Sequence, residues 1–134
     1  MTQRLFILTG ASRGMGLAMA QQLLQPGSTL VCMARNTNPQ LDTAAPPGAV
    51  LQQWTADLSE PVPAAQRLRT WLAGQPAGRY ASATLINNAG VIAGIAPLSA
   101  CTSAQDMDEL ARALRVGLEA PMLLTAAFLG ATEG

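Results

Sequence analysis

The chain has 134 residues, of which 49% are hydrophobic; this is the size of one domain with an apolar core and excludes a disordered tail. Eight basic and eight acidic residues give a formal net charge of zero, so no charge excess directs the protein to nucleic acid or to an anionic membrane. The two cysteines, Cys32 and Cys101, do not have the spacing of a zinc site, and there is no histidine. The sequence therefore predicts no metal site and excludes catalysis by a histidine dyad or triad.

The N-terminus leads directly into a short apolar run that ends at Gly10 and is too brief for a signal sequence. No apolar stretch approaches the roughly 20 residues that span a bilayer. Two unpaired cysteines are compatible with a reducing compartment. We therefore expect a soluble, cytoplasmic protein that does not enter a membrane.

Strand and helix patterns alternate along the first two thirds of the chain. Apolar runs predict strands at residues 5–9, 28–34 and 83–86, and a looser alternation before Asp57 predicts a strand at residues 50–55. Helical spacing predicts one helix from Gly14 to a stop at Pro26, and another over residues 64–73. Three prolines within residues 36–48 indicate a surface loop. This alternation is typical of an α/β fold with a parallel sheet and crossover helices.

The last predicted element is a helix from about 103 to 129. Thr102 and Gln105 fit a capping box, and acidic residues follow in the first turn, where the helix dipole favours them. Apolar residues recur at helical spacing at Met107, Leu110, Leu114 and Leu118. We expect a kink at Pro121 and find no fifth strand after the helix.

A glycine-rich segment, Thr-Gly-Ala-Ser-Arg-Gly-Met-Gly at residues 9–16, lies between the first predicted strand and the first predicted helix. At this place a loop can present a helix N-terminus to a pyrophosphate. Gly10 permits a tight turn, Gly14 lets the backbone approach phosphates, and Gly16 lets the helix pack on the strand. The alternative interpretation is a purely structural turn.

Together with Asp57–Leu58 after the third strand and Asn-Asn-Ala-Gly at residues 87–90 after the fourth, this segment resembles the short-chain dehydrogenase/reductase family. The resemblance covers all 134 residues in order. Residues 85–91 and 120–125 are similar to the sepiapterin-reductase-like and benzil-reductase-like members. The resemblance to the family implies a Rossmann-type, doubly wound parallel sheet, truncated here after about four strands, with residues 1–134 forming an NADP(H)-binding half-domain.

The resemblance also implies which residues bind the cofactor. It assigns phosphate and adenosine-ribose contacts to the glycine-rich loop, adenine contacts to residues 57–58, and contacts to the other ribose to residues 88–90. The residues so assigned are Gly10, Ser12, Arg13, Gly14, Met15, Gly16, Arg35, Asp57, Leu58, Asn88, Ala89 and Gly90. Two alternatives stay open: Asp57 as a turn residue at the end of a strand, and Asn88 as a structural amide that joins neighbouring strands.

The end of the second strand distinguishes NADP from NAD. An NAD enzyme places an acidic residue there to accept hydrogen bonds from the ribose 2′-hydroxyl, but this chain has Ala34 followed by Arg35. Arg35 and Arg13 can instead make charge-assisted contacts to a 2′-phosphate. The sequence therefore predicts NADP(H), with solvated surface arginines as the alternative.

The family's catalytic residues are missing from the chain. The resemblance implies a serine, a tyrosine and lysine four residues apart, and an asparagine from the long helix. The chain has no lysine, its only tyrosine, Tyr80, precedes the fourth strand, and Gly117 occupies the asparagine position. We therefore expect no catalytic residue in this chain, which is either a natural truncation or a fragment of a longer enzyme.

Two functional hypotheses follow. The first is part of an NADP(H)-dependent carbonyl reductase or alcohol dehydrogenase that acts, when complete, on a small-molecule carbonyl or alcohol. The second is a non-catalytic nucleotide-binding or interaction module. We expect a homodimer or higher oligomer, built by helix pairing or strand exchange, or else association with the missing half, because a fourth strand without a neighbour and an apolar helix face would be exposed together.

Overall fold

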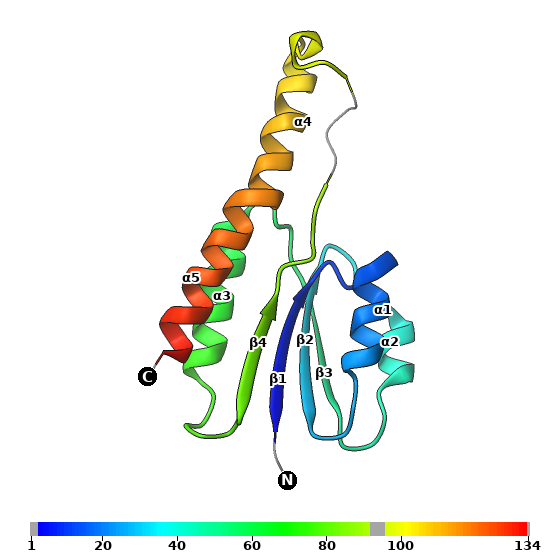
Figure 1. The fold of residues 1–134 in the computed structure, drawn as a ribbon, viewed down its shortest axis with the longest axis vertical. Helices are drawn as coiled ribbons and strands as arrows, with labels where there is room; N and C mark the ends of the chain where they lie inside the picture. The colour runs from blue at the N-terminus through cyan, green and yellow to red at the C-terminus, as the bar shows by residue number, and fades with distance from the viewer. Residues whose placement is uncertain (1–2, 92–95, 134) are drawn as a thin grey trace.

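The computed structural model describes residues 3–91 and 96–133. Within these residues, one parallel sheet has the strand order β3-β2-β1-β4 (Figure 1). Its strands are β1 (Arg4–Thr9), β2 (Ser28–Ala34), β3 (Val50–Thr55) and β4 (Ser82–Ile86). All carboxyl ends therefore lie at one edge of the sheet, with β1 and β2 as the two inner strands. The predicted fold class, a Rossmann-type parallel sheet, is confirmed.

Helices cover both faces of the sheet (Figure 1). The helices α1 (Gly14–Leu23) and α2 (Pro39–Ala44) lie on one face, and α3 (Pro61–Ala73) and α5 (Ala120–Thr132) lie on the other. Successive strand residues point to opposite faces, so Leu8 and Leu30 join the core under α1, whereas Ile7 and Val31 join the core under α3 and α5. Two separate cores explain why the inner strands have continuous apolar runs at residues 5–8 and 30–34.

The segment expected to be a surface loop contains a helix, so that expectation is wrong. Pro39 begins α2, where the missing N–H of proline costs no hydrogen bond, and the side chain of Asn38 caps the helix. Leu41 is fully buried against the core under α1. Proline also explains the start of α3 at Pro61, three residues before the predicted start at residue 64.

The long helical run differs from its prediction at two points. The run begins with α4 (Ala104–Leu114). Because this helix starts at Ala104, its capping box is formed by Ser103 and Asp106 rather than by Thr102 and Gln105. A π-helical turn, η2 (Arg115–Glu119), joins α4 to α5. The irregularity thus lies in the turn before Pro121, since a proline ring crowds the carbonyl four residues earlier.

The run Ala104–Thr132 has 29 residues and is long and apolar enough, by length and composition alone, to cross a membrane. The expectation that no such stretch exists is therefore wrong on this criterion. Core helices of soluble proteins meet the same criterion; here 17% of the apolar window is buried, and the buried residues Ala120, Leu124 and Ala127 belong to α5, which packs against α3. One helix of this kind is weak evidence for a membrane span.

Candidate functional site

A cavity of about 440 Å³ lies at the carboxyl edge of the sheet. The walls come from four places: the loop between β1 and α1, the ends of β2 and β3, the segment after β4, and α4 with η2. Every residue predicted to bind a cofactor lines it, namely Gly10, Ser12, Arg13, Gly14, Met15, Gly16, Arg35, Asp57, Leu58, Asn88, Ala89 and Gly90. Residues far apart in the sequence are thus brought together at one place.

The glycine-rich loop makes close backbone contacts that a larger residue would prevent. Gly10 has φ +73°, and a Cβ added there would lie 2.9 Å from the Cα of Ala89. A Cβ added at Gly16 would overlap the carbonyl oxygen of Gly10 and the side chain of Asn88. These two glycines therefore let the first turn of α1 sit directly beside the end of β1 and the segment after β4.

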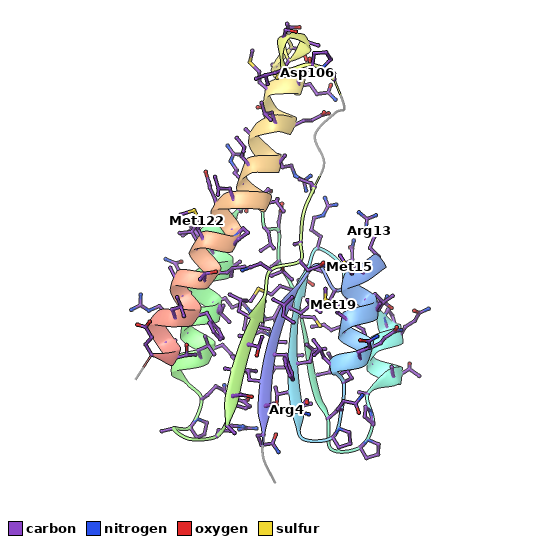
Figure 2. All side chains as sticks on the ribbon, in the orientation of Figure 1. Arg4, Arg13, Met15, Met19, Asp106 and Met122 are labelled. Atoms are coloured by element: carbon purple, nitrogen blue, oxygen red, sulfur yellow. The ribbon has the colours of Figure 1, made fainter. Side chains whose placement is uncertain are left out.

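The N-terminus of α1 faces this cavity with its backbone donors available. Arg13 is the N-cap residue in an extended conformation, without a side-chain cap, and the first turn of α1 contains no acidic residue. Figure 2 shows Arg13 at the upper end of α1, at the same edge of the molecule as the carboxyl ends of the strands. A helix end of this kind favours an anion.

The hydroxyl of Thr9 joins the ends of two strands. Its Oγ1 accepts hydrogen bonds from the backbone N–H groups of Asn88, at 3.0 Å, and Ala89, at 2.9 Å. The side-chain Nδ2 of Asn88 donates to the carbonyl oxygen of Gly10 at 3.3 Å. Asn88 therefore has the structural role that was left open as an alternative. Thr9 was not predicted to serve the site, because nothing local in its sequence signals a partner after β4.

Positive charge predominates among the described residues of the cavity wall. Arg13 and Arg35 come from the predicted positions, and Arg112 extends from α4, whereas Asp57 is the single carboxylate. In a chain of zero net charge, this local excess favours a polyanionic ligand. Arg112 was not predicted to bind a cofactor, because no motif surrounds it and its helix is recognised from the sequence by apolar spacing.

The carboxylate of Asp57 forms a turn after β3. Its Oδ1 accepts hydrogen bonds from the backbone N–H of Ser59, at 3.0 Å, and from the Ser59 hydroxyl, at 2.7 Å. These hydrogen bonds hold the pKa of Asp57 below its usual value, and the charges of Arg112 and Arg35 lower it further. Asp57 is therefore ionised at neutral pH and has the turn role left open above, while its exposed side chain still lines the cavity.

Two positions that concern catalysis lie outside this cavity wall. Gly117 is in the π-helical turn, exposed, with nothing within 4 Å of a Cβ added there. Tyr80 precedes β4, so it lies at the opposite edge of the sheet, where its hydroxyl donates to Gln75 at 3.2 Å. No metal-binding group of three or more His, Cys, Asp or Glu side chains forms among residues 3–91 and 96–133.

A parallel sheet with helices on both faces and a glycine-rich loop between β1 and α1 defines a dinucleotide-binding α/β fold. Residues 4–133 match the family model described as short chain dehydrogenase. The chain therefore belongs to the short-chain dehydrogenase family.

Two curated relatives match nearly the whole chain. Benzil reductase ((S)-benzoin forming) of Bacillus subtilis (strain 168) is 36% identical over 124 residues, which are 92% of this chain and 47% of the relative. Sepiapterin reductase of Xenopus laevis is 33% identical over 135 residues, which are 93% of this chain and 49% of the relative. The chain thus spans about half the length of the curated relatives it matches, and the predicted similarity to these two kinds of member is confirmed.

Among solved structures, the crystal structure of a metagenomic short-chain oxidoreductase in complex with NADP is similar, with a TM-score of 0.71 and 29% sequence identity. The match covers 97% of this chain and 56% of that one. The fold described above is therefore the fold of the corresponding part of a short-chain oxidoreductase.

Proposed function

We propose that the chain binds NADP(H) in the cavity at the carboxyl edge of the sheet, as the cofactor-binding part of an oxidoreductase. The observation that carries the proposal is the convergence of the glycine-rich loop, the ends of β2 and β3 and the segment after β4 on one cavity with three arginines. The complex of a similar short-chain oxidoreductase with NADP supports the choice of cofactor.

The residues present suit a dinucleotide. No atom lies within 4 Å of a Cβ added at Gly14, so the loop backbone is open to a pyrophosphate there, and the open N-terminus of α1 supplies N–H donors. We assign the 2′-phosphate to Arg13 and Arg35, the adenine to Asp57 and Leu58, and the other ribose to residues 88–90. The cofactor, when bound, supplies the hydride.

We further propose that this chain does not reduce a carbonyl by itself. Transfer of hydride to a carbonyl needs a positioned acid for the forming alkoxide, which contributes roughly 10²–10⁴-fold in rate. The only tyrosine, Tyr80, is at the opposite edge of the sheet, and all eight basic residues are arginines. A small-molecule carbonyl or alcohol, of the kind named for the benzil and sepiapterin reductases, would be a substrate only of a complete enzyme.

A second candidate function is a non-catalytic interaction module. It is favoured by the exposed apolar residues of the α4–α5 run, namely Met107, Leu114, Leu118, Met122 and Leu129, and by the edge position of β4. We propose that these surfaces mediate a homo-oligomer, whether the chain is part of an enzyme or an interaction module. We also propose that the protein is cytoplasmic. Light scattering tests the assembly, and a clean monomer at micromolar concentration would contradict it.

Calorimetric titration with NADPH and NADH tests the proposed cofactor. Tighter binding of NADPH is expected, and equal affinity, or tighter NADH, would overturn the assignment of Arg13 and Arg35. An assay of NADPH oxidation with benzil tests the catalytic part of the proposal. A rate well above the blank would show that an acid has been overlooked, whereas binding without turnover supports the proposal.

A further inference from the structure

Asn38 connects three parts of the fold through nearly all of its polar groups. Its backbone N–H donates to Gln53 Oε1 at 2.8 Å, and its carbonyl accepts from Gln53 Nε2 at 2.9 Å. Its side-chain Oδ1 accepts from the backbone N–H of Gln40 at 2.9 Å and so caps α2. Its side-chain Nδ2 donates to the carbonyl oxygen of Ser12 at 2.9 Å. The residue thus links β3, α2 and the glycine-rich loop.

Only the last of these hydrogen bonds reaches the glycine-rich loop. Ser12 immediately precedes Arg13, and Arg35 lies three residues before Asn38, so the Asn38–Ser12 hydrogen bond joins the two backbone segments that carry these arginines. Both arginine side chains are exposed, so the backbone beneath them is what limits how far apart the guanidinium groups lie. Two such groups bind one phosphate more tightly when their separation is fixed beforehand, because less conformational entropy is then lost on binding.

We propose that Asn38 is a positioning residue for the choice between NADP(H) and NAD(H). By tying the β2–α2 connection to the glycine-rich loop, it holds Arg13 and Arg35 at a separation that one 2′-phosphate can bridge. The inference rests on the NADP(H) preference proposed above and extends it to a residue that does not line the cavity.

The other hydrogen bonds of Asn38 allow this role to be tested alone. In Asn38→Ser, a hydroxyl can still cap α2, and the two backbone hydrogen bonds with Gln53 are unaffected, but the donor to Ser12 is lost. Asn38→Asp is unsuitable, because its added negative charge would itself repel a phosphate. Gln40→Ala is the matched control, since the side chain of Gln40 is exposed and its capped N–H belongs to the backbone.

The experiment measures the dissociation constants of NADPH and NADH for the wild type, Asn38→Ser and Gln40→Ala by calorimetry. We expect the NADPH preference to fall roughly 3–10-fold in Asn38→Ser, as expected for one lost hydrogen bond, with NADH affinity nearly unchanged. Gln40→Ala should match the wild type. Arg35→Ala should also weaken NADPH less in the Asn38→Ser background than in the wild type, because the two residues act together.

The outcomes separate this inference from the proposed function. A wild type without NADPH preference overturns the proposed cofactor and the role of Asn38 with it. A wild type that prefers NADPH, with the same preference in Asn38→Ser or an equal loss for both cofactors, overturns the role of Asn38 alone. If Asn38→Ser is too unstable to titrate, Asn38→Thr keeps the capping hydroxyl and suits the extended backbone there, φ −122° and ψ 112°, and the same comparison decides.

Discussion

Replacing Arg35 by alanine should weaken NADPH binding and leave NADH binding nearly unchanged. A charge-assisted hydrogen bond contributes about 1.5–3 kcal/mol, and two features of the site reduce the effect here. The Arg35 side chain is exposed, so solvent screens its charge, and Arg13 and Arg112 line the same cavity. We therefore expect a loss of about 1–2 kcal/mol, which is roughly 5–30-fold in the dissociation constant of NADPH.

Isothermal titration at low and moderate salt concentrations measures this effect. The preference of the wild type for NADPH should shrink as salt increases, because the contact is electrostatic and partly exposed. Arg69→Ala is the matched control: it removes the same charge from an exposed position on α3 that does not line the cavity. An equal loss for both cofactors in Arg35→Ala, or the same loss in Arg69→Ala, would refute the reasoning.

Three further changes test other parts of the structure. Gly16→Ala should destabilise the protein by roughly 1–3 kcal/mol or more and abolish cofactor binding, because the added Cβ overlaps the loop; a thermal melt like that of the wild type would contradict this. Gly117→Ala should raise the free energy of unfolding by about 0.5–1 kcal/mol, since Gly117 is helical, exposed and unobstructed; urea unfolding measures it, and a loss of stability would be the opposite result. The pKa of Asp57 is lowered in the folded state, so its carboxylate stabilises the fold above the ordinary carboxyl pKa, and this stabilisation is lost as pH falls through the pKa of the folded state. In Asp57→Asn, the free energy of unfolding should therefore fall less steeply on the acid side when it is measured against pH. An unchanged pH dependence would show that the Ser59 hydrogen bonds contribute nothing.

The strands and most of the cavity wall could be predicted from the sequence because their signals are local. The strand β2 is buried on both faces and has its predicted bounds because such a strand is a continuous apolar run. The edge strand β3 contains Gln52 and Gln53, and a looser alternation of apolar and polar residues predicts its bounds. The motif positions follow strands, and the carboxyl ends of parallel strands share one edge. The fold could therefore be predicted from the strand patterns, and the residues around the cavity from the motifs that follow the strands.

The parts of the site that could not be predicted from the sequence depend on contacts between segments far apart along the chain. The Thr9 hydroxyl accepts hydrogen bonds from Asn88 and Ala89, which follow it by 79 and 80 positions, and no local pattern in the sequence indicates such partners. Arg112 lines the cavity because it lies in the last turn of α4, next to η2, whose Val116 lines the cavity as well. The helix start was misplaced by one residue because Thr102 and Ser103 both offer a capping hydroxyl, and backbone geometry selects Ser103. The helix α2 was missed because its proline is at a position where proline is tolerated.

The hydrogen bonds of Thr9 have a consequence for the order of assembly. The floor of the cavity requires β1 and the segment after β4 to be in contact, and these are separated by most of the chain. The ribosome must therefore release β4 and the residues that follow it before the cavity can form, and a growing chain that holds only the glycine-rich loop would have no complete cavity. A ligand that binds only the complete cavity stabilises the native state by mass action. A rise in melting temperature on adding such a ligand therefore indicates that β4 has paired with β1.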